Sequence, residues 1–349
     1  HVVNGTSVSI NEAVGKTVVI GTSGFSGYDG HVFGGGKGDE TNYDPYLKVE
    51  ATDPDDEIPA HANFDCGRVG GNTSVTMTKG TVLGNVYGGG MIALTGVGRK
   101  GLENYKDNGF WSFINEDENG NNVYDSIHHG MTTVAITGGF IGNPVNSGLT
   151  LLRSLQESGN VYGGGRGKID EYREDDYGRA AKAVVTISNS PTIYGSVFGG
   201  GQMANVGHWN NYASWYTTGT GATSVTITGS PTIGTAKEFE YIYYQGSHPY
   251  TRYETINNMS ILSHTRTGNV YGGGEGSVHV DDHHYAEGLE QGHCRTTSVN
   301  ISGSPFIMSS VFGGSEQGAV WGDTKVEIAG GTIGKENLTA EITGSSSTS

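Results

Sequence analysis

The stretch Val32-Phe33-Gly34-Gly35 is the first of six copies of one motif, a valine followed by an aromatic residue and at least two glycines. The other copies begin at Val86, Val161, Val197, Val270 and Val311. A third glycine follows in five of them, and Ser315 takes its place in the sixth. Because this motif recurs together with a second repeating element, the sequence predicts a stack of equivalent structural units.

The second element is a short segment in which apolar and polar residues alternate, as in Val75-Thr76-Met77 and Val185-Thr186-Ile187. It recurs at 8–10, 134–136, 225–227, 299–301 and 326–328. Apolar residues at positions i and i+2 predict a half-buried strand. A turn with Gly or Ser-Pro follows, and then a second short strand such as Thr192-Ile193.

Three short strands and three turns, all present within residues 182–201, predict one coil of a parallel β-solenoid. Neighbouring coils would lie about 4.8 Å apart. We therefore expect an all-β chain of about six to seven coils, with one solenoid domain over residues 1–344 and a Ser-rich tail at 345–349. A Gly-rich β-prism or a propeller-like repeat is the alternative fold.

Long inserts separate the predicted strands, at 37–72, 91–130, 143–159, 166–182, 202–222, 235–267 and 275–295. If the coils stack, we expect these inserts to project from one edge of the solenoid. Insertions in repeat proteins map to one face, which is often the binding face. That edge is where we expect function to lie.

The aromatic residue of each motif points away from its valine, so we expect a ladder of rings along the stack. Its members are Phe33, Tyr87, Tyr162, Phe198, Tyr271 and Phe312. Phe and Tyr occur equally often, which favours packing over chemistry and predicts that Tyr162→Phe is nearly neutral. The first glycines of the runs permit a sharp turn or close packing of an insert; they are Gly34, Gly88, Gly163, Gly199, Gly272 and Gly313.

Charge and composition exclude several function classes. The formal net charge of −16 argues against binding to nucleic acid or to an anionic membrane surface. No apolar run is long enough to span a membrane. The two cysteines are too few for a disulfide-rich scaffold or a zinc ribbon. We expect Cys66 and Cys294 not to pair, because the strands that follow them lie four repeat units apart.

The repeat resembles the Gly-rich VYGGG/VFGGG regions of large secreted proteins from Bacteroidetes and some Firmicutes. The resemblance covers roughly residues 5 to 335. It implies a β-solenoid in an extracellular, adhesin-like protein of the bacterial cell surface, and it supplies no catalytic residue. The chain begins at His1 without Met, so we expect a processed or excised piece.

One segment begins like a calcium-binding loop. Asn115, Asp117 and Asn119 place oxygen ligands at alternate positions before a glycine, and Asp125 stands near the loop's end. The final bidentate glutamate of such loops is missing. An acidic, solvent-exposed turn is the alternative interpretation, and calcium is the only cofactor that the sequence suggests.

Other inserts carry candidate binding residues. Exposed aromatic rings stack on sugars and anchor interfaces, and the candidates are Trp209, Tyr212, Trp215, Tyr241, Tyr243 and Tyr244. The alternative is that these rings form small local cores. The carboxylate clusters at 53–57 and 174–176, and the histidines at 279, 283 and 284, are weaker candidates for catalysis and for metal binding.

We therefore expect a non-catalytic, extracellular structural or adhesive module. Its terminal coils would present unpaired strand edges, so we expect head-to-tail self-association or continuation by adjoining segments of a longer chain. Surface glycans are further candidate partners. A polysaccharide-binding or polysaccharide-cleaving β-helix is the alternative function.

Overall fold

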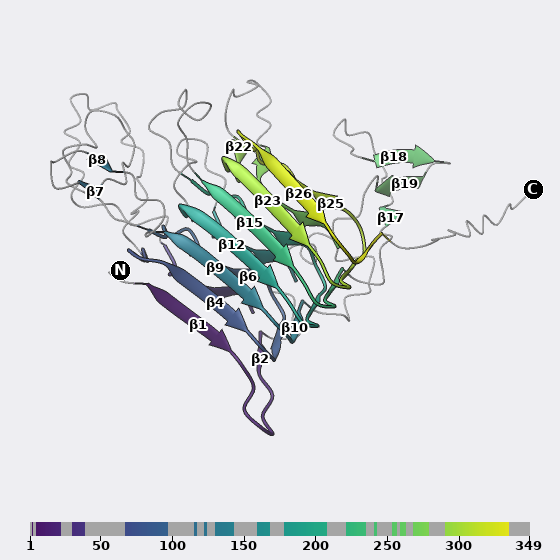
Figure 1. Cartoon of the computed structure of the whole chain (residues 1–349), viewed down its shortest axis with the longest axis horizontal. Coiled ribbons are helices and arrows are strands. Elements are labelled where there is room, and N and C mark those ends of the chain that lie inside the picture. Colours follow the sequence, from purple (N-terminus) through teal and green to yellow (C-terminus); the bar gives the residue numbers. More distant parts are fainter. Residues whose placement is uncertain are drawn as a thin grey trace, which may run out of the picture.

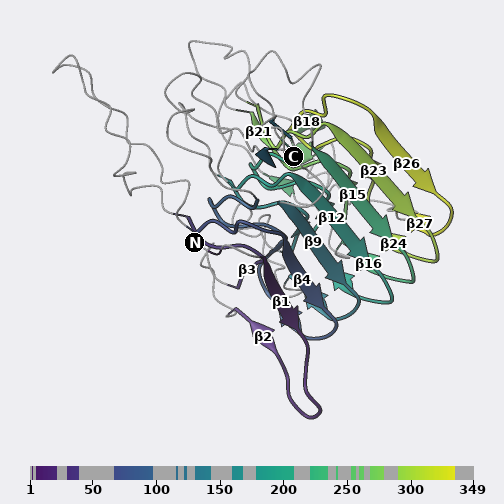
Figure 2. The same cartoon turned by 60° about the vertical axis from the view of Figure 1, so that its left-hand side comes forward.

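The computed structural model describes residues 5–21, 30–38, 67–96, 130–142, 159–167, 178–207, 221–234, 268–276 and 292–334. It also describes Val2 and the backbone of seven short strands between these ranges. The described chain forms three parallel sheets, built from the strands of a coil that repeats along one axis (Figures 1 and 2). The prediction of a parallel β-solenoid is confirmed, and the antiparallel prism and propeller alternatives are wrong.

The first sheet has seven strands, one from each coil. We number the coils from 1 to 7 in the order of these strands. In that order they are β1 (Thr6–Ile10), β4 (Thr73–Met77), β9 (Met131–Ile136), β12 (Lys182–Ile187), β15 (Ala222–Ile227), β23 (Thr296–Ile301) and β26 (Thr324–Ile328). Pairing is in register, so Val75 aligns with Val8 on one side and with Val134 on the other. Each alternating segment therefore presents the same face in every coil.

The second sheet also has seven strands, and the third has six. The second contains β2 (Val19–Ile20), β5 (Thr81–Val82), β10 (Phe140–Ile141), β13 (Thr192–Ile193), β16 (Thr232–Ile233), β24 (Phe306–Ile307) and β27 (Thr332–Ile333). The third contains β3 (Val32–Phe33), β6 (Val86–Tyr87), β11 (Val161–Tyr162), β14 (Val197–Phe198), β20 (Val270–Tyr271) and β25 (Val311–Phe312). It carries the Val-aromatic-Gly-Gly motif.

Seven further strands form small antiparallel sheets, and in the sequence they lie between the strands of the three stacked sheets. They are β7 (Asn115–Glu116) with β8 (Asn122–Val123), β17 (Tyr241–Ile242) and β18 (Tyr253–Ile256) on either side of β19 (Met259–Leu262), and β21 (Ser277–Val278) with β22 (Glu290–Gln291).

Each coil has a fourth stacked position that the sequence did not reveal. Parallel bridges join Val69, Thr95, Ala180 and Val206 from successive coils. Residues 91–96 and 202–207, predicted to belong to inserts, are therefore part of the coils, as are 67–72, 178–182 and 292–295, which lead into the first sheet. The alternation signal missed this row because each coil contributes a single bridged residue rather than a strand.

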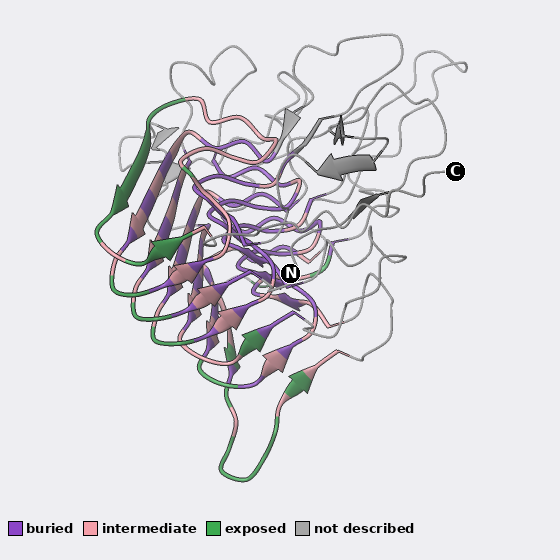
Figure 3. Ribbon diagram, turned by 90° about the vertical axis from the view of Figure 1, so that its right-hand side faces the viewer, coloured by how far each residue is buried: buried purple, intermediate pink, exposed green. Residues whose placement is uncertain are grey.

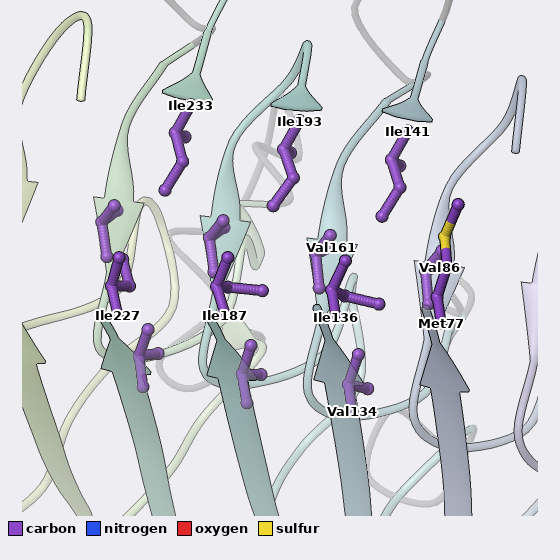
Figure 4. Packing of buried hydrophobic residues seen from close by; sticks show 14 of the residues in the cluster. Met77, Val86, Val134, Ile136, Ile141, Val161, Ile187, Ile193, Ile227 and Ile233 are labelled. Atoms are coloured by element: carbon purple, nitrogen blue, oxygen red, sulfur yellow. The ribbon is translucent and has the colours of Figure 1, made fainter. Parts of the chain in front are cut away.

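The core is a column of Val and Ile side chains enclosed by the three sheets. Figure 4 shows Ile136, Ile187 and Ile227 repeating from coil to coil, with Ile141, Ile193 and Ile233 facing them from the second sheet. All six are completely buried. Because every coil adds a similar set of side chains to the same column, the core grows with length and needs no larger cross-section.

The two ends of this column differ in exposure. In coil 7, Val326 and Ile328 are 40% and 51% exposed, whereas their coil 6 equivalents Val299 and Ile301 are 0% and 1% exposed. In coil 1, Ile10 is only 4% exposed. Figure 3 shows the exposed final strand at one end of the otherwise buried stack. The apolar core is thus exposed at the C-terminal end of the described solenoid. We call this exposed end the open core.

Candidate functional site

The six aromatic residues of the motif form one continuous stack. Neighbouring rings lie nearly parallel, with centroids 4.5 to 4.9 Å apart from Phe33 to Phe312. Tyr87, Tyr162, Phe198 and Tyr271 are buried, while Phe312 at the open end is 42% exposed. The predicted ladder therefore forms, and its rings are held at the coil spacing.

A row of polar side chains runs beside the ladder and connects successive coils. The residue before each Val-aromatic pair accepts a hydrogen bond from the backbone N–H of its counterpart in the next coil. Asn85 Oδ1 accepts from Asn160 N at 2.9 Å, and Asn160 Oδ1 accepts from Ser196 N at 2.7 Å. Ser196 Oγ and Asn269 Oδ1 continue the row. Buried polar groups of each coil are thereby satisfied by the neighbouring coil.

The identity of this polar residue depends on the ring two positions later. Asn precedes each of the three Val-Tyr pairs, and Ser or His precedes each of the three Val-Phe pairs. The reason is that the Asn amide donates to the tyrosine hydroxyl, at 3.0 Å from Asn85 to Tyr87 and 3.1 Å from Asn160 to Tyr162. This pairing is visible in the sequence as a correlation between residues two positions apart.

The tyrosine hydroxyls donate in turn to residues that directly follow the glycine runs. Tyr87 Oη donates to Gln202 Oε1 at 2.5 Å, and Tyr162 Oη donates to Glu275 Oε2. Burial and the nearby Glu275 carboxylate raise the pKa of Tyr162 well above its usual value. Tyr162 therefore remains a neutral donor, and its hydroxyl makes hydrogen bonds that the packing interpretation of the ladder did not include.

We expect Tyr162→Phe to lower the free energy of unfolding by about 1–3 kcal/mol, because a buried amide then loses its acceptor. The double variant Asn160→Ser/Tyr162→Phe reproduces the Ser196 and Phe198 pair of coil 4 and should recover part of that loss. Urea denaturation of the two variants and of Asn160→Ser checks this. Additive effects in the double variant would show that the amide and the hydroxyl are not coupled.

Pairs of glycines mark the points where segments leave the coils. In each pair, an ideal Cβ on one glycine would lie between 2.5 and 3.1 Å from the backbone of the other, so no side chain fits. The pairs are Gly21/Gly30, Gly38/Gly67, Gly96/Gly130, Gly142/Gly159, Gly167/Gly178, Gly207/Gly221, Gly234/Gly268 and Gly276/Gly292. We call these pairs the insert stems. Each stem returns the chain to the place where it left the coil.

The insert stems are of three kinds, and stems of the same kind recur on every second coil. Three lie between the second and third sheets in coils 1, 3 and 5, and three follow the glycine runs of those same coils. The remaining two follow the fourth position of coils 2 and 4. The insert stems thus lie at both ends of the third sheet's strands and directly after the fourth position. Alternation separates like stems by about 9.6 Å, close to the spacing that packed layers of chain require.

We expect excision of residues 208–220 to leave the solenoid folded, with a melting temperature within a few degrees of the parent. Joining Gly207 to Gly221 leaves three residues between Val206 and Thr223. Three residues also separate the equivalent Val320 and Thr324, where no insert occurs. Shortening a loop changes the closure entropy only slightly.

Circular dichroism and thermal denaturation of the excised protein test this expectation. Gly221→Ala in the full-length chain is the contrasting variant, because Gly221 has φ +121° and its Cβ would lie 2.5 Å from the Gly207 Cα. It should be destabilised by more than the excision. Unfolding caused by the excision would show that the 208–220 segment is part of the folding unit.

Most of the predicted ligand residues lie outside the described residues. Asn115 is on β7, while Asp117, Asn119 and Asp125 are not described. Tyr241 is on β17, and Trp209, Tyr212, Trp215, Tyr243 and Tyr244 are not described. The acidic clusters and the three histidines also fall outside. Within the described ranges, no three His, Cys, Asp or Glu side chains gather as metal ligands.

Cys294 is a free, buried cysteine in the fourth row, packed with Ala183, Val206 and Val320. Burial raises the pKa of its thiol to about 12. Cys66 is not described, but Val69, three residues later, leads into β4 of coil 2, whereas Cys294 leads into β23 of coil 6. That the two cysteines do not pair stays a prediction.

The outer side of the first sheet is a second candidate surface. Three rows of outward-facing residues run along it, beginning at Ser7, Ser9 and Asn11 in coil 1. A shorter fourth row at the start of the longer strands carries Met131, Lys182, Ala222 and Thr296. Figure 1 shows the strands of this sheet side by side. We call this surface the outer face.

Comparisons with protein-family models, curated proteins and solved structures found no match to this chain. In the part of the chain that the structure describes, no helix is long and apolar enough to cross a membrane.

Proposed function

We propose that this chain is a non-catalytic structural and adhesive module, located outside the cell at a bacterial surface, that is extended by stacking a further coil on its C-terminal end. The observation that carries the proposal is the open core of coil 7. Val326, Ile328 and Ile333 are 38% to 51% exposed, and their equivalents in coil 6 are 0% to 1% exposed.

The strand edge at this end favours the same conclusion. In the described sheets, β26 pairs with β23 and β27 pairs with β24, each on one side only. An unpaired edge is a template for addition of another strand. The strands β1 and β2 of a second copy carry the same alternation as β26 and β27, so they supply a matching coil.

The contact would join unlike ends of two copies. A heterologous contact of this kind does not close on itself and leads to a filament or to a longer continuous solenoid. The low exposure of Ile10 at coil 1 means that the first coil already shields part of its core. Assembly would therefore begin at the open end contributed by coil 7.

The extracellular and adhesive parts of the proposal are supported by the resemblance to secreted Gly-rich repeat proteins, by the acidic composition, and by insert stems that allow segments of any length to be carried. The polysaccharide-cleaving alternative depended on the carboxylates at 53–57 and 174–176, which lie outside the described residues. The described residues therefore add no observation in favour of that alternative.

Light scattering of the intact chain over a range of concentrations tests the stacking. We expect the parent to associate, and Ile328→Asp and a deletion of residues 1–20 each to remain monomeric while keeping a cooperative unfolding transition. Ile187→Asp at the equivalent buried position of coil 4 is the contrast and should unfold the protein. A parent that stays monomeric at high micromolar concentration would refute end-to-end stacking.

A further inference from the structure

The outer face is uncharged along most of its length. In coils 1 to 6 the rows that begin at Ser7, Ser9 and Asn11 comprise eighteen positions. Ser or Thr occupies five positions of the first row, four of the second and five of the third. The remaining four are Asn11, Ala135, Val184 and Asn300. None of the eighteen is charged, although 16% of the whole chain is charged. The shorter fourth row adds one charged residue, Lys182.

The hydroxyls of this face form a regular array. Like positions in neighbouring coils are in register and about 4.8 Å apart, and residues two apart along a strand are about 6.6 Å apart. Some neighbours are already joined, with Ser74 Oγ donating to Ser7 Oγ at 3.0 Å and Thr78 Oγ1 donating to Asn11 Oδ1 at 2.8 Å. Each hydroxyl has both donor and acceptor capacity, so the array retains groups for an external partner.

The chemistry of the outer face excludes most classes of partner. A nucleic acid or an anionic membrane requires a cluster of Lys and Arg, and in coils 1 to 6 the four rows of this face carry a single such residue, Lys182. Protein interfaces are enriched in aromatic residues, Met and Arg and depleted in Ser, which is the opposite of this composition. A partner that matches neutral hydroxyls over several coils must itself be neutral, extended and rich in hydroxyl groups.

We propose that the outer face is a docking surface for a neutral polysaccharide whose chains present a flat, repeating array of hydroxyl groups. This inference rests on the adhesive role proposed above and names the partner class for it. A regular array of weak contacts suits such a partner, because each coil adds an equivalent set of hydrogen bonds along the axis.

The last coil shows how to disrupt this surface without unfolding it. Lys325 and Glu327 occupy in coil 7 the positions held by Ser224 and Thr226 in coil 5. Their side chains form an ion pair at 2.9 Å and are 63% and 59% exposed. Charged side chains are therefore compatible with these two rows.

Co-sedimentation with microcrystalline cellulose tests the proposal. The protein used is the Ile328→Asp variant, so that end-to-end stacking does not contribute to retention. We expect it to bind, and we expect Thr186→Lys/Thr226→Lys on the outer face to weaken binding about tenfold or more. The matched control is Thr192→Lys/Thr232→Lys on the outward row of the second sheet, which should bind like its parent.

Melting temperatures of both lysine pairs are measured alongside binding. The natural Glu327, in the same row as Thr186 and Thr226, shows that a charged side chain is compatible with this row. Absence of cellulose binding by the parent, or equal losses in the two lysine pairs, overturns the proposal. A dimer that only the outer-face variant abolishes would instead identify this surface as a protein interface. Stacking is tested by light scattering of the intact chain and polysaccharide binding by co-sedimentation. The failure of either proposal can therefore be distinguished from the failure of the other.

Discussion

Gly200→Ala is expected to destabilise the solenoid by about 3 kcal/mol or more, or to prevent folding, because there is no space for a methyl group between adjacent coils. A Cβ on Gly200 would lie 2.7 Å from the Gly274 nitrogen and 2.9 Å from the Gly274 Cα. Both are backbone atoms of coil 5, so relief would require neighbouring coils to separate along the whole third sheet.

Gly314→Ala is the matched control for this variant. Gly314 occupies the same position of the motif in coil 6, and nothing lies within 4 Å of its Cβ position. Neither glycine has a positive φ, so the two sites differ in their neighbours alone. Gly314→Ala should be neutral or stabilising by up to about 1 kcal/mol. Equal effects in a denaturation experiment would mean that the close approach of adjacent coils is not what requires glycine in these runs.

Tyr162→Ala is expected to cost about 3–5 kcal/mol, since it removes a fully buried ring from the middle of the ladder. Tyr162 stacks on Tyr87 at 4.9 Å and on Phe198 at 4.8 Å. The cavity cannot collapse, because the sheets fix the coil spacing on both sides. The loss of the hydroxyl's hydrogen bonds adds to the cost.

The end of the ladder provides the comparison. Phe312 has one stacked neighbour, Tyr271, and is 42% exposed, so Phe312→Ala should cost less than half as much as Tyr162→Ala. Chemical denaturation of both variants measures the difference. If the proposed stacking of copies occurs, Phe312→Ala should lose more stability under conditions of assembly than in the monomer. A similar loss for the two truncations in the monomer would mean that ring stacking is not the main contribution.

Two kinds of glycine serve different purposes in this chain. Those of the motif, such as Gly200, allow the backbones of adjacent coils to approach. Those of the insert stems allow the chain to leave and return at one point, as at Gly207 and Gly221. From the sequence alone, the glycine runs are expected to permit sharp turns or close packing of inserts. The close neighbour is instead the next coil of the stack.

The sequence by itself determined the parallel solenoid, its valine and isoleucine column and its ring ladder. These features depend on short-range alternation and on a motif repeated in register, and both can be read from residues such as Val185, Ile187 and Phe198. It also contained the pairing of Asn with Tyr and of Ser with Phe, because those partners lie two residues apart.

Only the tertiary structure decided which atoms meet between coils. The contact of Tyr162 with Glu275, the alternation of insert stems, the fourth row and the open core at Ile328 all depend on which segments become neighbours after inserts of unequal length. Local periodicity does not encode that choice, since inserts of any length return to the same coil position. The stacking of coils brings those residues together, and the contacts follow from it.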